Sequence, residues 1–181
     1  MGYTHYWTYD PKSEEFQKGL LMLLPDAKLI IDRAEVRGIY VRGKAGANPV
    51  TEGGIWFNGA APPCVRDQEK YEHETFVMES SHPWLYAQES EWDEWLKEGY
   101  DTNGHHFVFC KTARKPYDLV VGAILLRANH LFGLDVSSDG NWDTADEWGV
   151  IRDFYREVFG EDAEAPRSMC PDPHRLPEVA L

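Results

Sequence analysis

The residues best suited to chemistry lie in one short basic stretch. Lys111, Arg114 and Lys115 fall within 102–117, a range without any acidic residue in a chain that has 31 acids and 18 bases. Lysine and arginine side chains hold phosphate and carboxylate groups through charge-assisted hydrogen bonds. Thr112 adds a hydroxyl group between them. The stretch therefore predicts a site for an anion.

The surrounding pattern places this basic stretch where a strand gives way to a helix. Residues 105–111 form the strongest predicted strand, and Pro116 suits the first turn of a helix over 117–132. The free N–H groups of a helix N-terminus favour an anion, and Tyr117 offers a phenol or an aromatic face. The alternative is that the bases pair with the surplus carboxylates of 89–101. The glycine spacing of a P-loop is missing, so a nucleoside triphosphatase is not indicated.

A second group of candidate residues lies in the aromatic N-terminal segment 3–9. Side chains alternate along a strand, so Tyr3, His5 and Trp7 share one face. His5 could act as a base or as a hydrogen-bond partner for a ligand, and the aromatic face could stack a nucleobase. The alternative is that His5 is a structural residue whose hydrogen bonds are satisfied inside the protein.

The remaining histidines do not form a metal-binding pattern. His105 and His106 are neighbours on a predicted strand and point in opposite directions, and no H-x-x-H or H-E-x-x-H motif occurs. We therefore expect no metal and no cofactor. His73, together with His5, remains a candidate general acid or base. Asn58 could contact a ligand, or it could simply form a turn with the glycine that follows it.

The elements that must position these residues indicate an α+β fold. Strands are predicted over 3–9, 38–43, 54–59, 73–78, 105–111 and 134–138. Three helices are predicted: one that starts from Ser13 and has a break or kink at Pro25, one over 117–132, and one from Asp143 or Thr144 to Gly160. Most strands are separated by loops, so we expect a mixed or mainly antiparallel sheet covered by two or three helices. We also expect the N-terminal strand to lie beside the strand over 106–111.

Composition and charge limit the class of protein. The chain of 181 residues is 43% hydrophobic, which predicts one packed domain over 1–160. Local composition predicts an acidic, Trp-rich insertion at 80–104 within it and a Pro-rich tail at 161–181. No apolar run is long enough for a membrane span, and the basic start of a secretory signal is missing. We therefore expect a cytoplasmic protein. The net charge of −13 argues against general nucleic-acid binding.

Several motifs together resemble a known family. The segments GYTHYW at 2–7, IWFNG at 55–59 and FCKTARKPYD at 109–118 occur in that order. In this respect the chain is similar to a family of small uncharacterised proteins encoded by tailed phages, prophages and some bacteria. The resemblance covers about 2–160 and implies a phage or mobile-element origin, and hence the host cytoplasm. It implies no activity.

The leading hypothesis is a binding protein for a phosphorylated small molecule, above all a nucleotide or a nucleotide-derived defence signal. Lys111, Arg114 and Lys115 would hold the phosphate, Tyr3, Trp7 and Tyr117 would frame the base, and His5, Asn58 and Thr112 would add polar contacts. Two alternatives stay open. One is a metal-independent phosphodiesterase or transferase that uses His5 or His73. The other is an acidic inhibitor of a host defence protein or DNA-binding protein. A homo-oligomer is possible in each case.

Overall fold

The computed structural model describes residues 2–80 and 105–170 of the chain. Over these ranges the strands are β1 (Thr4–Tyr9), β2 (Tyr40–Arg42), β3 (Val50–Thr51), β4 (Gly54–Ala60), β5 (Phe76–Glu79), β6 (His106–Lys111) and β7 (Asp135–Ser138), and the α-helices are α1 (Glu14–Val36), α3 (Asp118–Phe132) and α4 (Val150–Phe159). Every strand pair is antiparallel. The α+β fold class is therefore confirmed.

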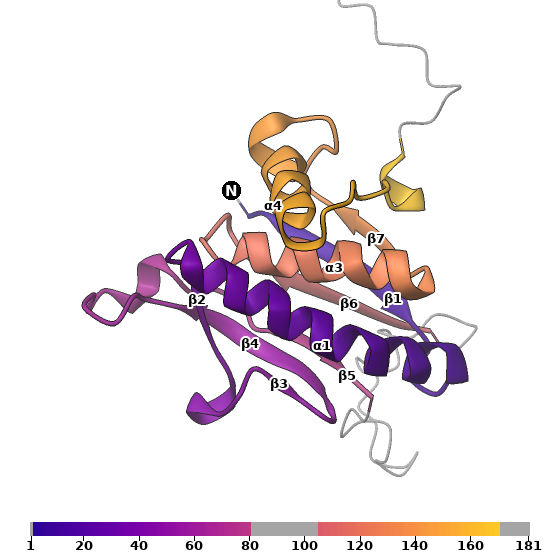
Figure 1. The fold of residues 1–181 in the computed structure, drawn as a ribbon, viewed down its shortest axis with the longest axis horizontal. Coiled ribbons are helices and arrows are strands. Elements are labelled where there is room, and N and C mark those ends of the chain that lie inside the picture. The colour runs from indigo at the N-terminus through magenta and orange to yellow at the C-terminus, as the bar shows by residue number, and fades with distance from the viewer. Residues whose placement is uncertain (1, 81–104, 171–181) are drawn as a thin grey trace, which may run out of the picture.

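The strands form two sheets behind a layer of helices (Figure 1). One sheet has the order β6-β1-β7, and in the other β4 pairs with β2, β3 and β5. In the first sheet Thr4 is the partner of Lys111, and His5 is the partner of Cys110. This confirms that the N-terminal strand lies beside the strand that ends in the basic stretch.

Strand β1 lies at the centre of its sheet, between β6 and β7, and its side chains alternate between the two faces. Tyr3, His5 and Trp7 are buried on the side that faces the helices. On the opposite side Tyr6 stacks on Phe107 of β6 at 5.9 Å between ring centroids. The predicted common face of Tyr3, His5 and Trp7 is confirmed, and it is an interior face.

The predicted break at Pro25 was wrong, because α1 continues through it to Val36. Ser13 caps the helix by accepting a hydrogen bond from the Phe16 N–H at 3.1 Å. Proline removes one helical hydrogen bond, here the bond to the carbonyl group of Leu21, whose residue is 62% exposed. Water can therefore satisfy that carbonyl group, while Leu23, Ala27 and other residues on the buried side hold the helix in place.

Helix α3 is the central helix of the domain. Its apolar residues are buried almost all round, and Gly133 ends it in the left-handed conformation, with φ 68°. A helix that is apolar on most faces belongs in the core. The N-terminus of α3 therefore lies in a fixed position directly after the basic stretch.

The last helix begins later than the sequence indicated. A π-helical turn, Ala145–Gly149, precedes α4, and Thr144 makes no side-chain capping bond. Gly160 ends α4 as predicted, with φ 73°. The π turn brings Trp148 into the core, a position that a regular helical start would not provide. Turns of this kind add a residue and are frequent at functional sites.

Smaller differences concern strands and loops. Strand β5 begins at Phe76 and not at His73, and the predicted loop over 43–54 contains β3 and a short 3₁₀ turn. Residues 161–170 lie against the sheet, where the Ser168 hydroxyl donates to the Asp135 carboxylate at 2.6 Å. The predicted insertion and the end of the tail lie outside the described residues.

Gly59 provides a test of the packing between β4 and α3. A Cβ at this position would overlap the Tyr71 carbonyl oxygen and the Tyr117 ring, whereas a Cβ at Gly53 would lie 3.8 Å from the nearest side-chain atom. We expect Gly59→Ala to lower the free energy of unfolding by about 1–3 kcal/mol, because overpacking forces the backbone to move. The matched variant Gly53→Ala should stay within about 0.5 kcal/mol. Urea denaturation measures both, and equal stabilities would contradict the close approach at Gly59.

Candidate functional site

The basic stretch forms a tight turn between β6 and α3. The N–H groups of Thr112 and Ala113 both donate to the Tyr3 carbonyl oxygen, at 2.9 and 3.1 Å. Ala113 and Arg114 adopt left-handed φ values of 51° and 56°. Residues other than glycine are uncommon in this conformation, and where they occur they often accompany functional sites. The turn directs the Arg114 side chain outward.

A buried hydrogen-bond network lies under this turn. The His5 side chain is fully buried, and its Nε2 lies 2.8 Å from Asp118 Oδ1. The Thr112 hydroxyl, also buried, donates to the same oxygen. Because an ionised carboxylate only accepts hydrogen bonds, His5 must carry its proton on Nε2. Among the described residues no hydrogen bond reaches Asp118 Oδ2, so this oxygen remains available as an acceptor.

Two of the basic side chains have partners at the surface. The Arg114 guanidinium pairs with Glu147 and lies 4.3 Å above the centre of the Tyr3 ring. The Asn141 backbone N–H and Arg114 lower the pKa of Glu147, and the same ion pair raises the pKa of Arg114. Lys115 Nζ donates to the Glu69 carbonyl oxygen at 2.7 Å. Arg114 therefore pairs with an acidic residue, but this residue is Glu147 and not one of the carboxylates of 89–101 that the alternative named, which lie outside the described residues.

Arg114 and Lys115 line a cleft of about 300 Å³. Its positively charged lining residues are Arg37, Arg114 and Lys115, and its carboxylates are Asp118, Asp146 and Glu147. The Tyr3 ring forms part of the wall. Burial raises the pKa of the Tyr3 phenol to about 12, and the charge of Asp118 adds to the rise. At neutral pH the phenol therefore stays protonated and cannot serve as a base.

Other predicted site residues lie outside this cleft. Trp7 packs against Phe76 at 5.2 Å between ring centroids, and Tyr117 donates its hydroxyl to the Glu74 carbonyl oxygen at 2.6 Å. Both side chains are fully buried. Burial also raises the pKa of Tyr117. In this structure neither ring has a face on which a ligand could stack.

Asn58, His73 and Lys111 form a structural junction on the other side of the turn. The Asn58 side-chain amide donates to the His73 carbonyl oxygen at 2.9 Å, and His73 Nδ1 lies 2.8 Å from the Lys111 carbonyl oxygen. The aliphatic part of the Lys111 side chain lies beside Gly2. These contacts connect β4 to the end of β6. The turn predicted at Asn58 and Gly59 was wrong, because both residues lie within β4 and pair with β2. The Asn58 side chain instead anchors the segment around His73.

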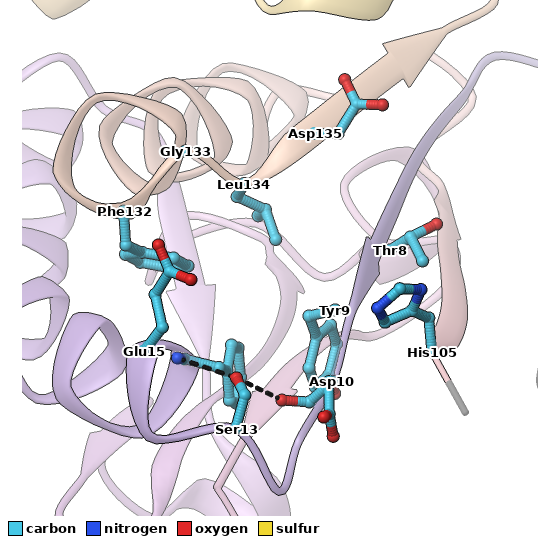
Figure 2. Close-up of a pocket in the computed structure, with 11 residues that line it drawn as sticks. Thr8, Tyr9, Asp10, Ser13, Glu15, His105, Phe132, Gly133, Leu134 and Asp135 are labelled. Atoms are coloured by element: carbon cyan, nitrogen blue, oxygen red, sulfur yellow. Dashed lines mark hydrogen bonds between the residues drawn. The ribbon is translucent and has the colours of Figure 1, made fainter. Parts of the chain in front are cut away.

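A larger hollow, of about 470 Å³, lies at the opposite end of β1. Figure 2 shows Leu134 and Tyr9 turned toward it and Glu15 beside Phe132. None of the predicted site residues lines it, and its described lining includes carboxylates but no lysine or arginine. Sequence reasoning missed this hollow because it forms where the end of β1 meets the start of β7, with Thr8 opposite Asp135. An acidic lining does not suit a phosphate.

No protein-family model, curated protein or solved structure matches this chain. The resemblance to phage proteins therefore stays a prediction. Within residues 2–80 and 105–170, no helix is long and apolar enough to cross a membrane. The same residues contain no group of three or more His, Cys, Asp or Glu side chains that could hold a metal ion.

The Asp118 network should contribute to stability. Asp118→Ala removes the hydrogen-bond partner of His5 Nε2 and one of the two acceptors of the Thr112 hydroxyl, whose other acceptor is the Tyr3 carbonyl oxygen at 3.4 Å. A buried donor left unsatisfied costs about 1–3 kcal/mol. We therefore expect a clear loss in the free energy of unfolding, measured by urea denaturation. Asp146→Ala is the matched control, because Asp146 lines the same cleft but is exposed, and it should change stability by less than about 0.5 kcal/mol. Equal effects of the two variants would show that the network does not stabilise the fold.

The reactivity of the Cys110 thiol provides a test of the burial of β6 beside the site. Burial and the nearby Glu74 charge raise the pKa of Cys110 to about 12, whereas Cys64 and Cys170 are exposed. Thiolates are the reactive form, so the native protein at pH 8 should react quickly with Ellman's reagent at Cys64 and Cys170 only. Cys110 should react after unfolding, and Cys110→Ala should abolish that late reaction. Fast labelling of Cys110 in the native protein would contradict its burial.

Proposed function

We propose that this protein binds a phosphorylated small molecule, a nucleotide or a signal derived from one, in the cleft between the basic turn and α4. The observation that carries the proposal is the position of Arg114 and Lys115 together on the lining of a cleft of about 300 Å³. Binding without turnover would make the protein a sequestering agent for its ligand. A phage origin would be consistent with this role.

Both side chains have hydrogen-bond donors to spare. A guanidinium group has five N–H donors and an ammonium group has three. The Arg114 side chain is 51% exposed and pairs with Glu147 through one terminal nitrogen. Lys115 donates to the carbonyl oxygen of Glu69. Both side chains therefore keep N–H donors for a phosphate group while they hold their present partners.

Asp118, which also lines the cleft, supplies an acceptor. Asp118 is held from behind by His5 and Thr112, both through Oδ1. Its free Oδ2 suits a ligand hydroxyl or amino group, which a sugar or a base would provide. A volume of about 300 Å³ is at the lower end of small-molecule pockets. The cleft thus favours a ligand the size of a mononucleotide.

The structure supports a different way of holding the base from the one that the sequence suggested. Trp7 and Tyr117 are buried, and the Tyr3 ring already carries the Arg114 guanidinium. The base would accordingly be held by hydrogen bonds at its edge, or it would project from the cleft. A nucleotide should then bind mainly through its phosphate and sugar.

The enzyme alternative has less support from the geometry. His5 is fully buried and contacts Asp118, and neither His5 nor His73 is among the described residues that line the cleft. A general acid or base must come within hydrogen-bond reach of the reacting group. If turnover occurs, Asp118 is the group placed to contact the substrate. The inhibitor alternative rests on the net charge of −13 and makes no use of the cleft.

Calorimetric titration with inorganic phosphate, ribose 5-phosphate and a panel of nucleotides tests the proposal. We expect heat on binding at least one phosphorylated ligand, and recovery of that ligand intact. A chemically altered ligand would favour the enzyme. No binding to any phosphorylated compound would contradict the proposal, and a stable protein complex from host lysate would then favour the inhibitor.

Arg114→Ala should weaken ligand binding without unfolding the protein. Hydrogen bonds to charged groups are worth about 1.5–3 kcal/mol, so the affinity should fall roughly ten- to hundredfold. Exposed ion pairs contribute about 0–1 kcal/mol to stability, so the melting temperature should change little. Arg66→Ala is the matched control, because Arg66 is exposed and does not line the cleft. Unfolding of Arg114→Ala would instead show that the basic turn is a structural ion-pair network.

A further inference from the structure

The outer face of α1 has a second set of regularly spaced residues, which do not pack in the core. Phe16, Leu20, Leu23, Ala27 and Ile30 are buried on the inner side of the helix. On the outer side, positions spaced by four and three residues in alternation form what we call the α1 seam: Lys18, Met22, Pro25, Leu29, Asp32 and Val36. Spacing that alternates in this way is the seam pattern of a coiled coil.

The apolar residues of the α1 seam are exposed. Met22 is 54% exposed, Leu29 37% and Val36 83%, and Leu21 beside them is 62% exposed. Figure 1 shows α1 running across the front of the molecule with the sheets behind it. Single exposed apolar residues need no explanation, but a contiguous apolar patch marks an interaction site.

The charges of the seam are complementary under a two-fold axis. Lys18 and Asp32 each lie seven residues from Pro25, on opposite sides of it. In an antiparallel pair centred on Pro25, Lys18 of one copy therefore meets Asp32 of the other, and the same contact occurs twice. Met22 meets Leu29 in the layers between. A two-fold interface requires this reciprocity, in which residue i contacts residue j and residue j contacts residue i.

Other arrangements fit less well. A parallel pair would place Lys18 against Lys18 and Asp32 against Asp32, and like charges in register are unfavourable. The net charge of −13 opposes self-association in general, but the seam itself carries one cation and one anion. Lys18 now pairs with Glu14 at 3.0 Å, with side chains 74% and 87% exposed, and such an exposed pair is easily exchanged.

We propose that α1 binds a second copy of this chain, as an antiparallel helix pair along the α1 seam. The inference is independent of the proposed ligand. One helix face per partner gives an interface at the small end of the range. The dimer is therefore weak and forms in a concentration-dependent equilibrium.

Sedimentation equilibrium at 0.15 M salt tests the interface. The wild-type chain should show a reversible monomer–dimer equilibrium, and Leu29→Glu should shift it to monomer at every concentration. Val65→Glu is the matched control, because Val65 has a similar exposure of 39% and is not part of α1, and it should leave the equilibrium unchanged. A wild-type chain that stays monomeric up to about 1 mM, or a dimer that survives Leu29→Glu, would overturn the proposal.

Charge reversal tests the antiparallel register. Lys18→Asp alone would place two carboxylates against each other at both ends of the seam, and so would weaken the dimer by about tenfold or more. Asp32→Lys alone would place two ammonium groups together, with a similar loss. The double variant Lys18→Asp/Asp32→Lys restores opposite charges only in the antiparallel pair, so its dimerisation should return to within about threefold of wild type. Failure of the double variant to recover would overturn the proposed pairing. Circular dichroism confirms that each variant is folded.

Discussion

The hydrogen bonds to Asp118 connect the start of α3 with the turn just before it and with the N-terminal strand, which is 113 residues away at His5. His5 belongs to the central strand β1, Thr112 to the turn after β6, and Asp118 to the first turn of α3. All three groups are wholly or partly buried, so their polar atoms need partners inside the protein. The position of the basic turn, and hence the direction of Arg114, depends on this contact.

The same contact decides where an anion can bind. Asp118 is itself a negative charge at the N-terminus of α3, where the helix dipole favours one. The N–H groups of Asp118 and Val120 already donate to the carbonyl oxygens of Lys115 and Tyr117. The protein thus supplies its own anion at the helix end. A ligand phosphate has to bind further out, at Arg114 and Lys115.

The sequence was informative where local pattern determines structure. Aromatic and β-branched residues predicted β1, and a strongly apolar, aromatic run predicted β6. Burial of one face fixes their register, because a shift by one residue would expose Trp7. The break predicted at Pro25 was wrong because the effect of a proline depends on its exposure. On the outer side of α1 the carbonyl group that loses its hydrogen bond is open to solvent, and packing on the inner side keeps the helix intact.

The candidate site was only partly predictable, because its contacts are tertiary. Arg114 and Lys115 stand out in an acidic chain, and both line the cleft. The partner of His5 lies 113 residues away, and that of Arg114 lies 33 residues away across a π turn. Contacts between residues so far apart in the chain leave no pattern in the local sequence from which they could be predicted. Burial of Trp7 and Tyr117 likewise follows from sheet and helix packing, since an aromatic residue suits a core as well as a binding site.

Local charge, more than net charge, determines what this molecule can attract. At physiological salt the Debye length is about 8 Å, so an approaching group senses mainly the charges nearest to it. The lining of the cleft contains three positively charged side chains, those of Arg37, Arg114 and Lys115, and three carboxylates. Two of those carboxylates, Asp118 and Glu147, already accept hydrogen bonds within the protein. An anionic ligand at the cleft therefore meets unused donors, even though the chain as a whole carries a charge of −13.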